Sequence, residues 1–476
     1  MAKKIYIAAG VALALSATAW HIVRPGQVMR IAAGVAAHHV CSMTFISGQD
    51  PKQTYDQLVA PVLGGFSRLF EVHVDRATHS VDVSSGPFTA LAHADFTPGY
   101  GCRLSLPGTR PLVADTATHP QANDGFAPAG AVTAAQPAIA AAIDRVFTES
   151  PDQPVKHVKA VVIVKDGHVI AERYAPGFDL HTPLLSFSVA KSFTNAFLGV
   201  LSREGRIRVD QPLGAPEWQA ADDPRRAITV ENLMRMSSGL DAEEAESAFS
   251  PVARMEFFHA DMAGFAARQP AKEAPGRTFE YTSADTVLLS RLVGEKVGGG
   301  PAGLRAFARR EVFDRLGMGD VTMEFDGQGT FVGSTYVYTT ARDYARFGML
   351  YLRDGIAPDG QRLLPEGWVD WSRRSTVGGS PYGAGFWTND GPSKPARWRV
   401  EAGFPKDGFY ASGTMGQRIY VVPSEKLVIV RFGYSAPPDY GIEDDLALIK
   451  ATIAATRTVK PSQVSPSPVR NIMRAS

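Results

Sequence analysis

One stretch of the sequence decides the fold: residues 184–193 read Leu-Leu-Ser-Phe-Ser-Val-Ala-Lys-Ser-Phe, and the apolar pattern continues at Leu198 and Leu201. Residues three apart share one face of a helix, so a helix here places Lys191 one turn after Ser188, with its amine near the hydroxyl. Ser186 is a candidate N-cap, which puts Ser188 in the first turn. There the helix dipole favours negative charge on an attacked substrate oxygen.

This S-x-x-K pattern predicts a nucleophilic serine with an amine base. A serine is a weak nucleophile at neutral pH and needs a neighbouring base. A lysine can serve when burial or nearby positive charge lowers its pKa. The pattern is short, so a chance match is the alternative, and the rest of the chain has to supply the missing partners.

Length and composition describe a globular chain of more than one domain. The chain has 476 residues, of which 45% are hydrophobic and 20% are charged, and its formal net charge is +1. This length exceeds that of one ordinary core. A net charge near zero does not favour a nucleic acid or an anionic membrane surface as a partner.

Residues 1–23 have the character of an export segment. Lys3 and Lys4 precede an apolar run over residues 5–23, and Ala17-Thr18-Ala19 has the small-x-small pattern that signal peptidase cuts. The segment is either a cleaved signal peptide or an uncleaved membrane anchor, since about 20 apolar residues suffice to span a bilayer. Both alternatives predict an exported protein, periplasmic or membrane-anchored, with the remaining chain outside the cytoplasm. A buried helix of a cytosolic protein is the third alternative.

The chain has two cysteines, Cys41 and Cys102. In an exported protein an even number of cysteines favours a disulfide, and two buried free thiols are the alternative. Both residues lie far before the S-x-x-K stretch, so a bridge between them is expected to staple the N-terminal region and not the site.

The order of the expected elements indicates an α+β fold. Residues 24–133 form an N-terminal accessory region, with a hairpin over 70–83 and a linker over 105–135. The main body then begins with a helix over 136–147. Strands over 158–164 and 168–174 follow, joined at Asp166-Gly167, and they lead directly to the Ser188 helix. Antiparallel strands that feed a helix are typical of an α+β sheet domain.

The remaining chain divides into a helical insertion and a second half of the sheet. Residues 207–333 are mainly helical in pattern, with Thr229 as a capping candidate. Residues 134–206 and 334–476 are expected to form one sheet domain. Its second half begins with a capping box at Thr340 and Asp343 before a helix to residue 352. Strands are expected over 382–387, 416–422 and 426–433, and a closing helix over 444–456.

The sequence argues against the other common hydrolytic sites. It contains no G-x-S-x-G and no H-E-x-x-H, and His259 is the only histidine after Ser188. A nucleophile elbow is therefore absent, and two distant cysteines do not make a zinc site without help. We predict no metal and no cofactor.

Two later stretches offer partners for Ser188. In residues 275–283, Tyr281 precedes an apolar helix and is expected to point its hydroxyl into a cleft. Two cationic groups nearby are expected to lower its pKa and let it shuttle a proton, although a packed loop tyrosine is the alternative. Residues 411–417 are small and lead into a strand, where an edge strand can offer a backbone N–H to an oxyanion. A plain glycine-rich strand entry is the alternative there.

Together these three motifs resemble the serine β-lactamase and penicillin-binding protein superfamily. Within it the chain is similar to the class C-related hydrolases, and most of all to the 6-aminohexanoate-dimer hydrolase group. Further stretches of sequence match that group at residues 161–177, 233–240, 340–348 and 409–417. The resemblance therefore covers about residue 134 to the end. It implies a β-lactamase/DD-peptidase-like fold: an antiparallel sheet flanked by helices, with an inserted, mostly helical domain.

The resemblance also implies roles for individual residues. Ser188 attacks an amide or ester carbonyl of a small-molecule substrate and forms an acyl-enzyme, while Lys191 and Tyr281 move the proton. The backbone N–H groups of Ser188 and Thr414 hold the oxyanion. Three further residues are expected to contact substrate: Ser283, Ser412 and Gly413.

Two departures from the family pattern bear on the substrate. Ser283 stands where β-lactamases of this kind carry asparagine, and residues 411–413 read Ala-Ser-Gly in place of Lys-Thr-Gly. That lysine helps hold the β-lactam carboxylate, so efficient penicillin hydrolysis is not expected. A D-alanyl-D-alanine peptidase and a non-catalytic binding protein of the same fold are the alternatives. An acidic loop at 241–246 is either a solvated surface or a rim that attracts a cationic substrate group.

Overall fold

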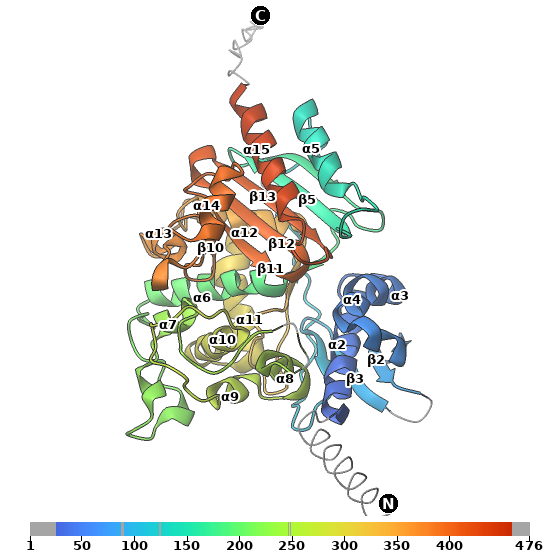
Figure 1. Ribbon diagram of the computed structural model, residues 1–476, viewed down its shortest axis with the longest axis vertical. Helices are drawn as coiled ribbons and strands as arrows, with labels where there is room; N and C mark the ends of the chain where they lie inside the picture. Colours follow the sequence, from blue (N-terminus) through green and yellow to red (C-terminus); the bar gives the residue numbers. More distant parts are fainter. Residues whose placement is uncertain (1–24, 87–89, 123–124, 246, 248, 459–476) are drawn as a thin grey trace, which may run out of the picture.

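The computed structural model describes residues 25–86, 90–122, 125–245, 247 and 249–458. A six-stranded sheet with its helices lies at one end of the molecule, a group of helices lies below it, and an N-terminal region packs beside both (Figure 1). The predicted export segment, residues 1–23, lies outside the described residues. Within the described ranges, no helix combines the length and the apolar character needed to cross a membrane.

The main sheet joins the two ends of the body. Its strand order is β10-β11-β12-β13-β5-β6, and every neighbouring pair is antiparallel. The expected hairpin over 158–174 is confirmed as β5 and β6, and β5 pairs with β13, which comes some 260 residues later. The strands are β5 (Val158–Lys165), β6 (His168–Tyr174), β10 (Trp387–Thr388), β11 (Phe409–Gly413), β12 (Gln417–Val422) and β13 (Leu427–Gly433).

Helices cover both faces of this sheet. Along β5, Val161 and Ile163 pack with α5 (Pro137–Phe147) and α15 (Ile442–Thr458) in one apolar cluster. The alternate residues Val162 and Val164 pack into a second cluster with α6 (Ala190–Arg203) and α12 (Ala341–Leu352). A sheet buried on both faces has apolar residues at successive positions, as β5 does. The expected α+β class, with an antiparallel sheet between helices, is therefore confirmed.

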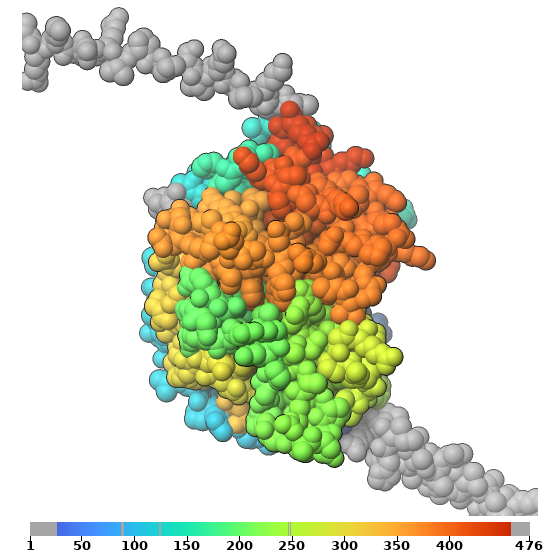
Figure 2. All heavy atoms as spheres, turned by 90° about the vertical axis from the view of Figure 1, so that its left-hand side faces the viewer, coloured from blue at the N-terminus to red at the C-terminus, as the bar shows by residue number. Residues whose placement is uncertain are grey.

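The helical part lies between the two halves of the sheet in sequence and below the sheet in space (Figure 1). It contains α7 (Val230–Met234), α8 (Pro251–Phe258), α9 (Met262–Ala267), α10 (Ser283–Val297) and α11 (Gly300–Ala308). A small sheet of order β7-β9-β8 connects it to the Ser188 stretch; its strands are β7 (Leu184–Leu185), β8 (Thr322–Met323) and β9 (Val337–Thr339). In Figure 2 the orange C-terminal half lies directly on the green helical residues.

The predicted caps Thr229 and Thr340 are confirmed, whereas the full capping box at Thr340 and the strand over 382–387 are not. Thr229 caps α7 in a full capping box with Asn232, and Thr340 accepts the N–H of Asp343 at the start of α12. The Asp343 carboxylate does not return to the Thr340 N–H, because it accepts from the Gly319 N–H and the Thr339 hydroxyl instead. The expected strand over 382–387 is wrong: Gly385 has a φ of +84° and turns the chain, so only Trp387–Thr388 form β10. Two short helices, α13 (Trp368–Arg373) and α14 (Lys394–Glu401), flank this turn in the sequence.

The N-terminal region is a helix packed on a four-stranded antiparallel sheet. The expected hairpin is confirmed as β1 (Glu71–Asp75) and β2 (Ser80–Ser84), and β3 (Ala90–Thr97) and β4 (Gly101–Leu104) extend it. Helix α2 (Pro25–Phe45) lies on this sheet, and the short helices α3 (Pro51–Thr54) and α4 (Ala60–Leu63) follow it. A disulfide joins Cys41 of α2 to Cys102 of β4, which confirms the expected pairing.

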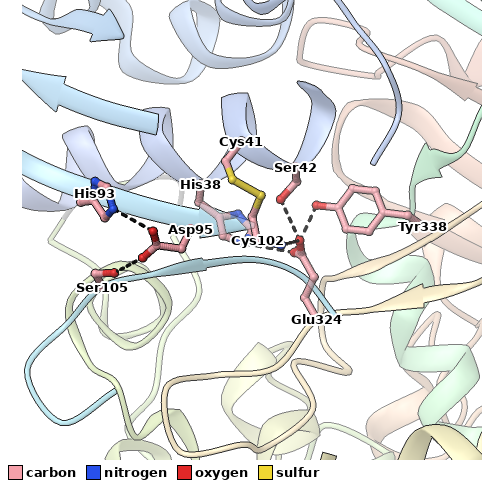
Figure 3. The surroundings of a disulfide bond; sticks show 9 residues. All are labelled: His38, Cys41, Ser42, His93, Asp95, Cys102, Ser105, Glu324 and Tyr338. Atoms are coloured by element: carbon pink, nitrogen blue, oxygen red, sulfur yellow. Dashed lines mark hydrogen bonds and ion pairs between the residues drawn. A yellow bond between two sulfur atoms is a disulfide. The ribbon is translucent and has the colours of Figure 1, made fainter. Parts of the chain in front are cut away.

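One buried carboxylate of the body binds several groups of this region. Glu324, which is 1% exposed, accepts hydrogen bonds from the Ser42 hydroxyl and the Cys102 N–H, both at 2.7 Å. It also pairs with His38 Nε2 at 3.0 Å. Figure 3 shows the Glu324 side chain reaching from the body toward the disulfide. An acid buried in this way costs free energy unless its oxygens are paired, so the region and the body are expected to be held in one arrangement.

Candidate active site

Ser188 lies at the start of the helix that the sequence predicts. A 3₁₀ turn over Phe187–Val189 precedes α6, and Phe187 adopts a φ of +45°. The expected capping role of Ser186 is wrong, because its hydroxyl faces the next strand. It donates to the Thr335 carbonyl at 2.9 Å and accepts the Val337 N–H at 3.0 Å. The turn that presents Ser188 is therefore fixed by the segment leading into β9 and not by a helix cap.

Lys191 is buried directly behind Ser188. Its Nζ lies 2.9 Å from Ser188 Oγ, 3.0 Å from Ser283 Oγ and 3.0 Å from the Ser334 carbonyl oxygen. These three acceptors match the three N–H groups of an ammonium. Burial lowers the pKa of Lys191, while the negative charges of two glutamates, Glu244 and Glu256, oppose that shift. The amine is thus closer than an ordinary lysine to losing its proton near neutral pH.

Tyr281 lies on the other side of the Lys191 amine. Lys191 Nζ is 4.8 Å from the centre of the Tyr281 ring, and the Tyr281 phenol interacts with the Ser188 side chain. The structure therefore brings the three predicted residues together. The ring stacks on Trp387 and meets Tyr382 edge-on, both at 5.5 Å between ring centres.

The expected fall in the pKa of Tyr281 is wrong. Burial raises this pKa well above its ordinary value, and the charge of Glu244 raises it further. The expectation assumed two cationic groups nearby, and a lysine whose own pKa is lowered does not supply them. Tyr281 therefore keeps its proton at neutral pH, which suits a proton relay better than a phenolate base.

The third predicted stretch lies against the backbone of Ser188. A methyl group built on Gly413 would come within 3.0 Å of the Ser188 nitrogen and 2.5 Å of the Ser186 carbonyl oxygen, so only glycine fits there. Ala411, Ser412 and Gly413 belong to β11 itself, and Thr414 opens the turn to β12. The oxyanion role of Thr414 and the substrate contacts of Ser412 and Gly413 stay predictions.

Buried polar side chains bind the backbone of the turn over Thr414–Gly416. Gln417 Nε2 donates to the Thr414 carbonyl at 3.1 Å, and Arg431 donates to the Gly416 carbonyl at 2.8 Å. Both donors are about 1% exposed. These two hydrogen bonds hold the carbonyl groups of the turn that begins at Thr414.

Sequence reasoning missed several groups around Lys191. Ser283, which the sequence predicts only as a substrate contact, also accepts a hydrogen bond from Lys191. Glu244 of the acidic loop turns inward and accepts the Ser283 N–H at 2.5 Å, whereas Asp241 and Glu243 are exposed. Ser334 supplies a carbonyl from a segment 143 residues after Lys191. No local pattern links Glu244 or Ser334 to Lys191, because their positions depend on long-range packing.

Histidines and metal-binding groups take no part in this arrangement. His259 packs its ring against Phe265 at 4.5 Å between ring centres, and no histidine of the described chain hydrogen bonds to Ser188. Among the described residues, no three or more His, Cys, Asp or Glu side chains are placed to hold a metal ion.

Comparisons with known proteins agree with the motifs. The model of the Beta-lactamase family matches residues 143–452, which is more than half of the chain. The 6-aminohexanoate-dimer hydrolase of Paenarthrobacter ureafaciens is 27% identical over 348 residues, which cover 66% of this chain and 84% of that protein.

Solved structures show the same fold at lower identity. The "Putative 6-aminohexanoate-dimer hydrolase from Bacillus anthracis" has a TM-score of 0.54 at 20% identity, covering 64% of this chain and 81% of its own. EstCE1, described as "a hydrolase with promiscuous acyltransferase activity", has a TM-score of 0.52 at 15% identity, covering 66% and 98%. The expected fold is confirmed. With its sheet, its S-x-x-K helix and its matched segment, this chain belongs to the beta-lactamase family of hydrolases.

Proposed function

We propose that this protein is a serine hydrolase that cleaves an amide or ester bond of a small molecule through an acyl-enzyme on Ser188. The observation that carries the proposal is the 2.9 Å contact between Lys191 Nζ and Ser188 Oγ, made by a lysine whose pKa is lowered by burial. An amine at that distance can take the serine proton as the hydroxyl attacks. Family membership supports hydrolysis, and the site supports serine as the nucleophile.

In the first half-reaction, Ser188 Oγ attacks the substrate carbonyl carbon while its proton passes to neutral Lys191. The carbonyl oxygen becomes an oxyanion, for which the N–H groups of Ser188 and Thr414 are the proposed donors. As the intermediate collapses, the bond to the leaving nitrogen or oxygen breaks. That atom receives a proton from Lys191 through the Tyr281 hydroxyl, which accepts one proton as it gives up another.

In the second half-reaction, water takes the place of the leaving group. Neutral Lys191 takes a proton from the attacking water through the Tyr281 hydroxyl, which accepts one proton as it gives up another, and the ester bond to Ser188 Oγ breaks. The proton returns to the serine oxygen, and the acid product leaves. No step requires a metal or a cofactor, because the charge that develops falls on groups with N–H and O–H donors beside them.

The surroundings of the site favour amides and esters over β-lactams. Tyr281, Tyr382 and Trp387 form an aromatic wall beside the nucleophile, suited to an uncharged or extended acyl or leaving group. The β11 stretch has Ala411 at the position where penicillin-recognising members carry the lysine of Lys-Thr-Gly. The similar protein from Paenarthrobacter ureafaciens is named 6-aminohexanoate-dimer hydrolase, and we propose hydrolysis of an amide or ester bond here.

Labelling with a fluorophosphonate probe tests the proposal most simply. The wild-type protein should be labelled, and peptide mapping should place the phosphonate on Ser188. Ser188→Ala should lose the label together with the hydrolysis of p-nitrophenyl acetate and butyrate. Equal labelling of the wild type and Ser188→Ala would reject the assignment, and a lack of labelling in both would favour a non-catalytic binding protein.

We also propose that the protein is exported, with its catalytic part outside the cytoplasm. The lysines and apolar run of residues 3–23 and the disulfide between Cys41 and Cys102 support this, because disulfides persist in oxidising compartments. Fractionation of a bacterial host that expresses the full chain should find it in the periplasm or the membrane. Soluble cytoplasmic protein with both thiols reduced would contradict the proposal.

A further inference from the structure

The turn between β11 and β12 has an uncommon backbone conformation where it passes the nucleophile. Met415 adopts a φ of +62° and Gly416 a φ of +87°, so two successive residues lie in the left-handed region. A residue other than glycine rarely keeps this conformation without support from its surroundings. Gly413, just before the turn, lies against the Ser188 nitrogen. Relaxation of the turn would therefore move backbone that lies beside Ser188.

Donors from β13 and the loop after it bind the carbonyl oxygens of these two left-handed residues. The Ser435 N–H donates to the Met415 carbonyl at 2.9 Å. The guanidinium of Arg431 donates to the Gly416 carbonyl at 2.8 Å and to the Met415 carbonyl at 3.4 Å. Arg431 thus bridges both residues with one side chain.

Arg431 is itself held by two buried partners. Its second terminal nitrogen donates to the Ser435 hydroxyl, which donates onward to the Lys156 carbonyl at 2.6 Å. Its Nε lies 3.6 Å from Asp445 Oδ1 on α15. Arg431, Ser435 and Asp445 are each 1% exposed. A planar guanidinium with acceptors on several sides has a fixed orientation, so it can impose that orientation on the turn.

A second buried arginine lies opposite Arg431 in the sheet and provides a comparison within the molecule. Arg418 of β12 is the register partner of Arg431 on β13, and it is 4% exposed. It donates to Asp445 Oδ2 at 2.6 Å and to the carbonyls of Asp439 and Tyr440 at 3.1 and 2.9 Å. Within the described residues, none of its hydrogen bonds goes to the turn. The two arginines share burial, charge and a carboxylate, and they differ in their contact with the turn.

We propose that Arg431 is a positioning residue for the reaction: it holds the turn over Met415 and Gly416 so that the Thr414 N–H points to the place where the oxyanion forms. The inference rests on the proposed function, because it requires acyl transfer at Ser188. A preorganised donor stabilises the charge of the transition state more than it stabilises the uncharged substrate. Loosening the turn should therefore slow the chemical step and leave substrate binding almost unchanged.

Arg431→Met removes the donors to the turn, and Arg418→Met is the matched control. Each variant leaves Asp445 beside the other arginine, so neither leaves a buried carboxylate alone. For p-nitrophenyl butyrate, Arg431→Met should lower kcat roughly 10- to 100-fold with KM within about threefold, a part of the about 10²- to 10³-fold cost of losing an oxyanion donor. Arg418→Met should keep kcat within about threefold of the wild type. Both are assayed at a temperature where thermal unfolding shows them to be folded.

A thionoester makes the test specific for the oxyanion. In p-nitrophenyl thionobutyrate a sulfur atom replaces the carbonyl oxygen, and sulfur is a weak hydrogen-bond acceptor. The wild type should therefore prefer the oxygen ester, and Arg431→Met should reduce that preference by roughly 3- to 10-fold, because the oxygen ester loses more from a displaced donor. A general distortion of the site would lower both rates equally. Arg418→Met should keep the wild-type preference.

If Arg431→Met does not fold, Ser435→Ala replaces it, because this change removes an acceptor of Arg431 and keeps the backbone N–H that binds Met415. It should shift kcat and the oxygen preference in the same direction by a smaller factor. Fluorophosphonate labelling of Ser188 in the wild type separates the two proposals. With labelling intact, an unchanged oxygen preference, or an equal change in Arg418→Met, would overturn the role of Arg431 alone. Without labelling, the proposed function would be rejected, and this inference with it.

Discussion

The N-terminal region and the family-matched body contribute to the molecule in different ways. The body, residues 143–452, supplies every group proposed to react, and its site depends on contacts between α6, α10, β9 and β11. Most of the N-terminal region lies before the residues that the family model matches. It contains the disulfide and the residues that bind Glu324. Changes in the body should therefore remove activity at constant stability, whereas changes in the N-terminal region should lower stability first.

The two regions meet close to the nucleophile. The ring of His39 on α2 lies 5.8 Å from the ring of Phe187, the residue before Ser188, and His38 interacts with Glu256. The N-terminal region is thus part of the support for the site and not a separate module. A comparison of substitutions on the two sides can show how far that support reaches.

The largest effect is expected in the body. Tyr281→Phe removes the relay hydroxyl while the ring keeps its contacts with Trp387 and Tyr382. Loss of a proton shuttle should lower kcat/KM for amides about 10²- to 10⁴-fold. Steady-state kinetics measures this loss. Thermal unfolding should show an unfolding temperature close to that of the wild type. A variant with near-normal amide hydrolysis would remove Tyr281 from the mechanism.

A smaller effect is expected from opening the disulfide. The bridge closes a loop with a sequence separation of 61 residues, so Cys41→Ala with Cys102→Ala should lower the free energy of unfolding by about 2–4 kcal/mol. Chemical denaturation measures this change. The folded variant should keep kcat within about threefold of the wild type, because the reacting groups are in the body. A large loss of kcat in a fully folded variant would show that the N-terminal region controls the active site more strongly than proposed.

The smallest effect is a pH dependence of stability carried by α2. Burial first, and the neighbouring His38 second, lower the pKa of His39 to about 3 in the folded protein. The unfolded chain binds this proton near pH 6.5, so stability is full above that pH and is lost as the pH falls toward 3. At pH 5 the loss is about 2 kcal/mol relative to pH 7.

Two histidine variants isolate that contribution. His39→Phe keeps an aromatic ring in the same place and should flatten the dependence between pH 7 and 5, measured by urea unfolding. His73→Phe, on the exposed side of β1, should leave the dependence as it is. If the free energy of unfolding of His39→Phe changed with pH as much as that of the wild type, another group would be responsible for the pH dependence.

The sequence predicted those parts of the fold that have local signals. The β5–β6 hairpin follows from a run of apolar residues and a glycine turn, and Thr229 and Thr340 mark the starts of α7 and α12. Helix α2 has no such signal, since its small apolar residues are buried on several sides. The strand expected over 382–387 is interrupted at Gly385, because the residue order does not show that this glycine adopts a positive φ and turns the chain.

The site divides in the same manner. Helical spacing alone places Lys191 beside Ser188, and the position of Tyr281 before an apolar helix suggests it as a partner, a role that the resemblance then specifies. Glu244 and Ser334 could not be found, because they reach the surroundings of Lys191 only through packing between distant segments. The direction of the Tyr281 pKa was missed for a related reason: residue order does not show how much water is excluded from a side chain.

The central claim is that an amine, and not an imidazole, activates Ser188. The rate of fluorophosphonate reaction at Ser188, measured against pH in Lys191→Met and His259→Gln, tests it directly. We predict that Lys191→Met loses at least about 10³-fold at neutral pH, in line with removal of the base for a serine nucleophile. His259→Gln should follow the wild-type profile. Retained labelling in Lys191→Met, or a comparable loss in His259→Gln, would contradict the claim.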